Sequence, residues 1–154
     1  MNVFDTDPAR YLPHHPPMLL LDRVVSADAE TTRCRVTVGS QCALFRADDG
    51  SYPNALFIEF MAQTIGVYAG IRDGSGQPRV GFLLGSRNIE LRKEKIFEGD
   101  VYDIDAHCVF FGQEELPSQF ECRVSENGAE AASAVLTVYR PSSLQQFVQE
   151  TSHP

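Results

Sequence analysis

A continuous apolar segment near the middle of the chain constrains the fold more than any other feature. Residues 54–70, Asn-Ala-Leu-Phe-Ile-Glu-Phe-Met-Ala-Gln-Thr-Ile-Gly-Val-Tyr-Ala-Gly, contain one charged side chain, that of Glu59. A helix that is apolar on every side is buried, so the rest of the domain must enclose it. A carboxylate in such a helix is costly unless it is paired or protonated. Glu59 is therefore either a satisfied structural residue or a functional one.

Strand-like segments lie on both sides of this helix. Two precede it, at residues 19–27 and 31–38, and the second alternates apolar and polar residues as a half-buried strand does. Asn127-Gly128 predicts a tight hairpin near the end of the chain. The strands expected after the helix are 80–91, with a kink at Gly85, then 100–111, 118–124 and 131–139.

The remaining segments are expected to be irregular. Residues 1–18 are rich in proline and histidine and predict an extended coil, and residues 40–53 predict a loop. The Gly- and Pro-containing cluster at 72–78 ends the helix. The polar tail at 141–154 is either frayed or forms a short helix at 144–148.

Two strands, one long apolar helix and four strands favour an α+β fold in which a curved antiparallel sheet wraps around the helix. This arrangement is the hot-dog fold. We expect one such domain over residues 1–154, with its core at about 11–140. An open edge of such a sheet is usually paired across a dimer, so we expect a homodimer or a heterodimer with another hot-dog protein.

Composition excludes several classes of function. The net charge of −8 argues against a general nucleic-acid binder, which needs a basic face. The four cysteines are widely spaced, which disfavours a zinc or redox site and indicates a reducing compartment such as the cytoplasm, although a disulfide stays open. The chain starts with no secretory signal, and no apolar run approaches the roughly 20 residues that span a membrane.

Three motifs resemble the (3R)-hydroxyacyl-acyl carrier protein dehydratases. Residues 11–24, Tyr-Leu-Pro-His-His-Pro-Pro-Met-Leu-Leu-Leu-Asp-Arg-Val, resemble their opening motif Leu-Pro-His…Leu-Leu-x-Asp-Arg-Val. Ile58-Glu-Phe-Met-Ala-Gln63 resembles their central helix, and Phe97-Glu-Gly-Asp100 resembles their Pro-Gly-Asp turn. The opening and helix motifs look most like the dehydratase-like subunits of aryl polyene pathways.

The resemblance implies a hot-dog lyase without metal or organic cofactor. It implies dehydration of a 3-hydroxyacyl thioester, carried on acyl carrier protein, to the trans-2-enoyl thioester in fatty acid or polyene-type biosynthesis. Glu59 matches the catalytic glutamate and would be the acid, because burial favours the neutral form of a carboxyl group.

The catalytic histidine of the family has no counterpart at its usual place. Counting back from Glu59, the matching position is Phe45, and residues 45–53 contain no histidine. The base must then be another histidine. The candidates are His14, His15 and His107.

His14 is preferred among them because it falls on the Leu-Pro-His position, although it could equally belong to a surface turn. We interpret His107, in a strand-like run, as structural, and His153 as part of the tail.

Several residues are expected to hold the substrate. The backbone N–H of Ala55 or Leu56, at the helix start, could stabilise the enolate-like oxygen. Gln63 lies four residues after Glu59 and could donate a hydrogen bond to it, or simply pack in a dimer. The apolar flank expected to line an acyl tunnel consists of Leu56, Phe60, Ile65 and Val67.

A basic cluster could steer the acidic carrier protein. It consists of Arg87, Arg92, Lys93 and Lys95. The interleaved Glu90 and Glu94 favour the plainer reading of a solvated strand end, and Asp22 is expected to be structural.

Two alternatives to a dehydratase remain open. The missing motif histidine is consistent with a non-catalytic subunit that stabilises an active dehydratase partner. A hot-dog acyl thioesterase is the other alternative, because there a helix carboxylate serves as base or nucleophile and no histidine is required.

Overall fold

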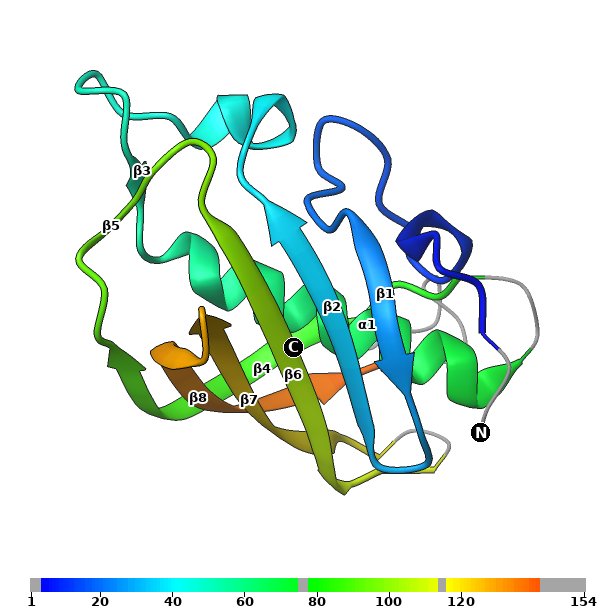
Figure 1. Ribbon diagram of the computed structural model, residues 1–154. Helices are drawn as coiled ribbons and strands as arrows, with labels where there is room; N and C mark the ends of the chain where they lie inside the picture. The colour runs from blue at the N-terminus through cyan, green and yellow to red at the C-terminus, as the bar shows by residue number, and fades with distance from the viewer. Residues whose placement is uncertain (1–3, 75–77, 114–115, 142–154) are drawn as a thin grey trace, which may run out of the picture.

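A six-stranded antiparallel sheet curls around one long helix, as Figure 1 shows. The computed structural model describes residues 4–74, 78–113 and 116–141. The strand order is β1-β2-β6-β7-β8-β4. The strands are β1 (Arg23–Ala27), β2 (Thr31–Thr37), β4 (Phe82–Leu91), β6 (Val101–Phe110), β7 (Ser118–Glu126) and β8 (Ala129–Tyr139). This is the predicted hot-dog fold.

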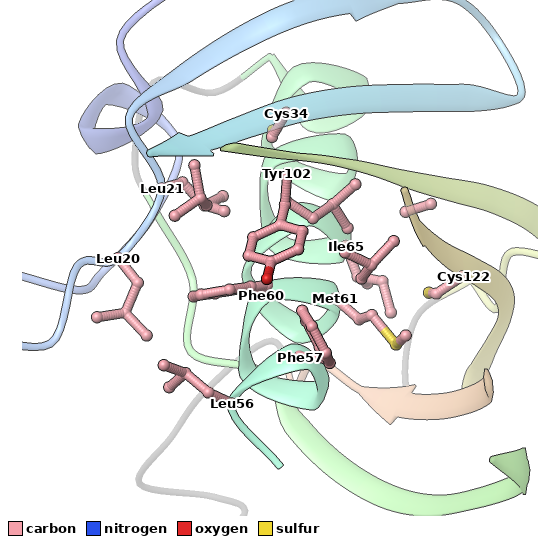
Figure 2. Close-up of a cluster of buried hydrophobic side chains, with 14 of the residues drawn as sticks. Leu20, Leu21, Cys34, Leu56, Phe57, Phe60, Met61, Ile65, Tyr102 and Cys122 are labelled. Carbon is pink, nitrogen blue, oxygen red and sulfur yellow. The ribbon is translucent and has the colours of Figure 1, made fainter. Parts of the chain in front are cut away.

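Helix α1 (Leu56–Asp73) supplies much of the core. Its Phe57 ring meets Tyr102 of β6 edge-on, with ring centroids 5.0 Å apart, and Phe60 lies beside both (Figure 2). The helix ends where Gly74 adopts a left-handed conformation and its N–H bonds to the carbonyl of Gly70. The observed helix thus starts two residues after the predicted one and continues three residues beyond it.

One side of α1 is not enclosed by this chain, which corrects the expectation of complete burial. The partly exposed stripe consists of Ile58, Glu59, Ala62 and Gly66. The cause lies in the sheet: α1 packs on β2, β6, β7 and β8, whereas β4 curls past the helix and is exposed along most of its length. The edge strand therefore leaves the stripe open.

The hairpin prediction is confirmed. Asn127 and Gly128 both have positive φ, 51° and 82°, as a two-residue turn between twisted strands requires. The expected irregularity at Gly85 is also present, because the pairing of β4 with β8 changes register between Leu83 and Gly85.

Three segments differ from the prediction. Only the second half of the run at 19–27 forms β1, because Leu20 and Leu21 are buried in an extended segment outside the sheet. The expected coil and loop contain short 3-10 helices, η1 (Pro8–Arg10) and η2 (Ser40–Phe45). A two-stranded ribbon of β3 (Tyr52–Pro53) and β5 (Lys95–Ile96) was not expected. The tail helix at 144–148 lies outside the described residues.

Within the described segments, no helix has the length and apolar character needed to cross a membrane.

Candidate functional site

Glu59 and His14 lie together at the open side of α1. Glu59 stands in the first turn of the helix, and His14 belongs to the N-terminal segment that crosses it. The distance from His14 Nε2 to Glu59 Oε1 is 3.9 Å, just beyond a hydrogen bond. The two side chains are 32% and 37% exposed, so Glu59 is not the buried carboxylate that the sequence predicted. A substrate could reach both groups.

Two glycines of α1 bring His14 to this place. A Cβ at Gly66 would lie 2.6 Å from Leu12 Cδ2, and one at Gly70 would lie 2.8 Å from Tyr11 Cβ. The N-terminal segment therefore lies directly on the helix, with Leu12 buried in the contact. The sequence analysis missed this contact, although two glycines four residues apart in an apolar helix are a signal for close backbone approach.

Gln63 fixes the next part of the same segment. Its Nε2 donates to Glu59 Oε1 at 2.9 Å and to the Met18 carbonyl at 2.7 Å, and its Oε1 accepts from the Leu20 N–H at 3.0 Å. With all of these bonds made inside the protein, Gln63 orients Glu59 and does not line the pocket wall.

A pocket of about 180 Å³ opens between the helix stripe and the N-terminal segment. Glu59, Ile65 and Gly66 line it from the helix, and Leu12 and His14 line it from the N-terminal segment. The rest of the wall comes from the start of β4 and the end of β8, with Gly81, Phe82, Leu83, Val138, Arg79 and Arg140. This volume suits the reacting end of a substrate rather than a long chain.

The expected acyl-lining flank needs correction. Of its four members only Ile65 reaches the pocket. Leu56, Phe60 and Val67 are buried in the core, where Phe60 packs near Phe57 and Tyr102 (Figure 2). They face the concave side of the sheet because that surface, not the pocket, has the apolar area to cover them.

One nitrogen of His14 has no partner. Its Nδ1 is buried and makes no hydrogen bond in the structure as described. Buried polar atoms normally find a partner, so an unsatisfied ring nitrogen in a pocket suits a group that a substrate completes.

The other histidines lie elsewhere. His15 is exposed, and His153 is outside the described residues. His107 bonds through Nδ1 to Thr31 Oγ1 at 2.8 Å. It lies on the outer face of β6, where alternate residues point away from the helix. A larger, shallow hollow of about 710 Å³ lies on that face. It is remote from Glu59 because the sheet separates them.

The place of the missing motif histidine is filled by packing. Phe45, the last residue of η2, is partly buried against the core. No imidazole can act from that position, which leaves His14 as the histidine near Glu59 among the described residues.

Two backbone donors at the start of α1 are unused. The N–H groups of Phe57 and Ile58 bond to the carbonyls of Asn54 and Ala55, both at 3.0 Å. Those of Ala55 and Leu56 have no acceptor within the described part of the chain. They stand at the positive end of the helix dipole, about one turn before Glu59, outside the wall of the pocket.

The expected carrier-steering cluster is largely neutralised. Arg92 pairs with Glu90 and Glu130 at 2.5 and 2.7 Å. Lys93 pairs with Asp100 and Glu126 at 2.7 and 2.9 Å, and Lys95 pairs with Asp49 at 2.7 Å. These partners come from distant parts of the chain, so the sequence gave no sign of them. The plainer reading, a paired and solvated surface, fits better.

Asp22 has the structural role that was expected. Its carboxylate accepts from the Thr37 N–H at the end of β2 and from Gln41 Nε2. Burial raises the pKa of Asp22, and the Thr37 hydrogen bond opposes that shift. In the described portion, no three His, Cys, Asp or Glu side chains gather as metal ligands would.

Known proteins with the same architecture include dehydratases. A solved structure described as the dehydratase heterocomplex ApeI:P from Xenorhabdus doucetiae superposes with a TM-score of 0.87 and 29% identity, over 96% of this chain and 98% of that chain. Thioesterases also superpose, such as the PaaI protein of Escherichia coli with a TM-score of 0.57, but at 14% identity they show the fold alone.

Sequence relatives agree with the structural match. The 3-hydroxyacyl-[acyl-carrier-protein] dehydratase FabZ of Nitrobacter hamburgensis is 32% identical over 129 residues, 80% of this chain and 83% of the relative. FabZ of Brucella ovis is 28% identical over 127 residues, 80% of this chain and 79% of the relative. The family model for ApeP-like proteins, described as ApeP dehydratase, matches residues 6–149. The chain therefore belongs to the ApeP-like dehydratase family.

Proposed function

We propose that this chain dehydrates a 3-hydroxyacyl thioester, carried on acyl carrier protein, to the trans-2-enoyl thioester, with His14 as base and Glu59 as acid. The observation that carries the proposal is the 3.9 Å approach of His14 Nε2 to Glu59 Oε1 inside a pocket. An imidazole and a carboxyl group so placed can act on neighbouring carbons of one substrate. The family and its FabZ relatives support the same reaction.

The chemistry balances with these two groups alone. Neutral His14 takes the proton from Cα, and the electron pair of that C–H bond becomes the new double bond. The Cβ–O bond breaks as neutral Glu59 gives its proton to the leaving hydroxyl group, which departs as water. His14 then holds one extra proton and Glu59 lacks one, and transfer across the short gap between them restores both.

Negative charge develops on the thioester oxygen during proton removal. The unused N–H groups of Ala55 and Leu56 are the donors proposed for it, because aligned donors at a helix start stabilise such charge. Gln63 keeps the Glu59 carboxyl group oriented through its 2.9 Å hydrogen bond. It is a positioning residue.

We propose that the working form is a dimer with another hot-dog protein, in the cytoplasm. Leu84 and Ile89 on edge strand β4 are 56% and 45% exposed, which suits a strand that another chain covers. The related ApeI:P structure is described as a heterocomplex. The four cysteines are free thiols, in keeping with a reducing compartment.

A non-catalytic role is the second candidate. It is favoured by Phe45 at the motif histidine position and by a His14–Glu59 distance beyond a hydrogen bond. In that case an active hot-dog partner would do the chemistry and this chain would stabilise it.

One experiment separates the two candidates. Enoyl thioester formation from 3-hydroxyacyl carrier protein is followed by ultraviolet absorbance, with the chain alone and with a hot-dog partner. Glu59→Gln and His14→Ala are each expected to lower the rate by about 10²–10⁴-fold, as loss of an acid or base does. His15→Ala and Glu121→Gln, at sites outside the pocket, are the matched controls. Activity that depends on the partner and ignores both pocket substitutions would instead identify a structural subunit.

A further inference from the structure

A second hollow with three arginines lies at the far end of α1. Arg72 comes from the last turn of the helix, Arg79 from the segment before β4, and Arg140 from the residue after β8. They line a space of about 380 Å³ that also touches Phe111. Three converging arginines are unexpected in a chain of net charge −8, so this hollow is locally basic in an acidic protein.

These arginines lack the carboxylate partners that the other basic side chains have. The arginines of β2, for example, pair with carboxylates of β6 at 2.7 and 2.8 Å. Over the described ranges, no carboxylate lies within salt-bridge distance of Arg72, Arg79 or Arg140. The pocket wall includes Asp73, whose charge acts on Arg140 only at longer range.

The local geometry leaves donors unsatisfied. Arg79 Nη2 donates to the Arg140 carbonyl at 2.9 Å, yet its Nε is buried without a hydrogen-bond partner among the described residues. The Arg72 guanidinium stacks 4.3 Å from the centre of the Phe111 ring and donates to the Tyr68 hydroxyl. Burial lowers the pKa of Arg140, and the nearby Arg79 charge adds to this. An anion in the hollow would relieve both the charge repulsion and the missing hydrogen bond.

The hollow is continuous with the candidate active site. Arg79 and Arg140 line both the arginine hollow and the pocket that contains Glu59 and His14. Along α1, Glu59 and Arg72 are separated by about 20 Å at roughly 1.5 Å per residue. An extended molecule could therefore place a reacting group beside Glu59 and an anionic group among the arginines.

We propose that Arg79 and Arg140, with Arg72 at the rim, bind the phosphate of the phosphopantetheine arm that carries the acyl thioester. This inference rests on the proposed function, because only a carrier-bound thioester has such an arm. The arm ends in the thioester at one side and in a phosphate at the other, which matches the order of the two sites. Guanidinium groups bind phosphate oxygens through paired, charge-assisted hydrogen bonds.

The test compares two substrates that differ only in the phosphate. Dehydration of a 3-hydroxyacyl phosphopantetheine is measured beside that of the 3-hydroxyacyl pantetheine that lacks the phosphate. The wild type is expected to favour the phosphorylated substrate in kcat/KM by about ten- to a hundredfold, mainly through KM, as hydrogen bonds to a charged group would give. Arg79→Gln should remove this preference and leave kcat/KM for the unphosphorylated substrate unchanged. Arg23→Gln, on exposed β1, is the matched control.

A second measurement does not depend on activity. Calorimetric titration with phosphopantetheine should show binding by the wild type, weakened about tenfold or more in Arg79→Gln and in Arg72→Gln, whose side chain is exposed. Arginine-dependent binding by a chain that proves inactive would refute the proposed reaction and keep the site. Equal handling of both substrates and no arginine-dependent binding would overturn the site. If the variants lose activity only with intact carrier protein, the arginines bind the carrier's acidic surface, and the phosphate assignment is wrong.

Discussion

Replacing Gln63 with leucine should destabilise the protein by about 2 kcal/mol. Gln63 is 1% exposed, and its side chain joins α1 to the backbone of Met18 and Leu20. Leucine has nearly the same size but leaves the buried Leu20 N–H without an acceptor, which costs about 1–3 kcal/mol. Water can replace the bond to the part-buried Met18 carbonyl at a smaller cost. The added apolar burial recovers about 1 kcal/mol at most.

The change is measured by urea and thermal unfolding at one fixed protein concentration, because dimerisation would shift apparent stability. For a domain of this length, about 2 kcal/mol corresponds to a Tm lowered by roughly 4–8 °C. Gln119→Leu is the control, because Gln119 makes only a 3.5 Å contact with Arg87 on an exposed face. It should stay within about 0.5 kcal/mol of wild type. An unfolding midpoint of Gln63→Leu equal to that of the control would refute the reasoning.

Three further predictions concern the site, the acid range and the hairpin. Gly70→Ala adds a Cβ 2.8 Å from Tyr11 Cβ and should lower dehydration about tenfold or more by moving the segment that bears His14, although alanine favours the helix by about 1 kcal/mol; unchanged rates would show that the segment adapts. Burial opposes ionisation of Asp100, but hydrogen bonds led by that from Lys93 outweigh it and lower the pKa of Asp100, so this contribution is present above about pH 4 and lost as pH falls further. Wild type should therefore lose unfolding free energy between pH 5 and 2 more steeply than Asp100→Asn, and parallel curves would contradict this. Gly128→Ala, at φ 82°, should cost about 1–2 kcal/mol in urea unfolding, and a neutral result would show that the turn relaxes.

Local patterns in the sequence predicted most of the architecture. The apolar run at 54–70 announced α1, and Asn127-Gly128 announced the β7–β8 turn, because both signals lie within a few neighbouring residues. Strands β3 and β5 escaped notice, since two residues are too few to show any periodicity. Whether the helix was covered on every side also depended on how far β4 curls, which no local pattern encodes.

The site was only half visible in the sequence. Glu59 could be singled out because a charge in an apolar helix is conspicuous. The approach of His14 depends on Gly66 and Gly70 admitting the N-terminal segment, a tertiary contact that spacing alone does not show. Likewise, the carboxylates that neutralise Lys93 and Lys95, and the convergence of the arginine hollow, join segments far apart in the chain.

The most direct test of the central claim is a double-mutant cycle on dehydration. Single-turnover rates are measured for wild type, His14→Ala, Glu59→Gln and the double variant, with folding checked by circular dichroism. If the two groups act as one unit, each single change lowers the rate by about 10²–10⁴-fold and the double variant falls little further. Single variants within about threefold of wild type would contradict the account.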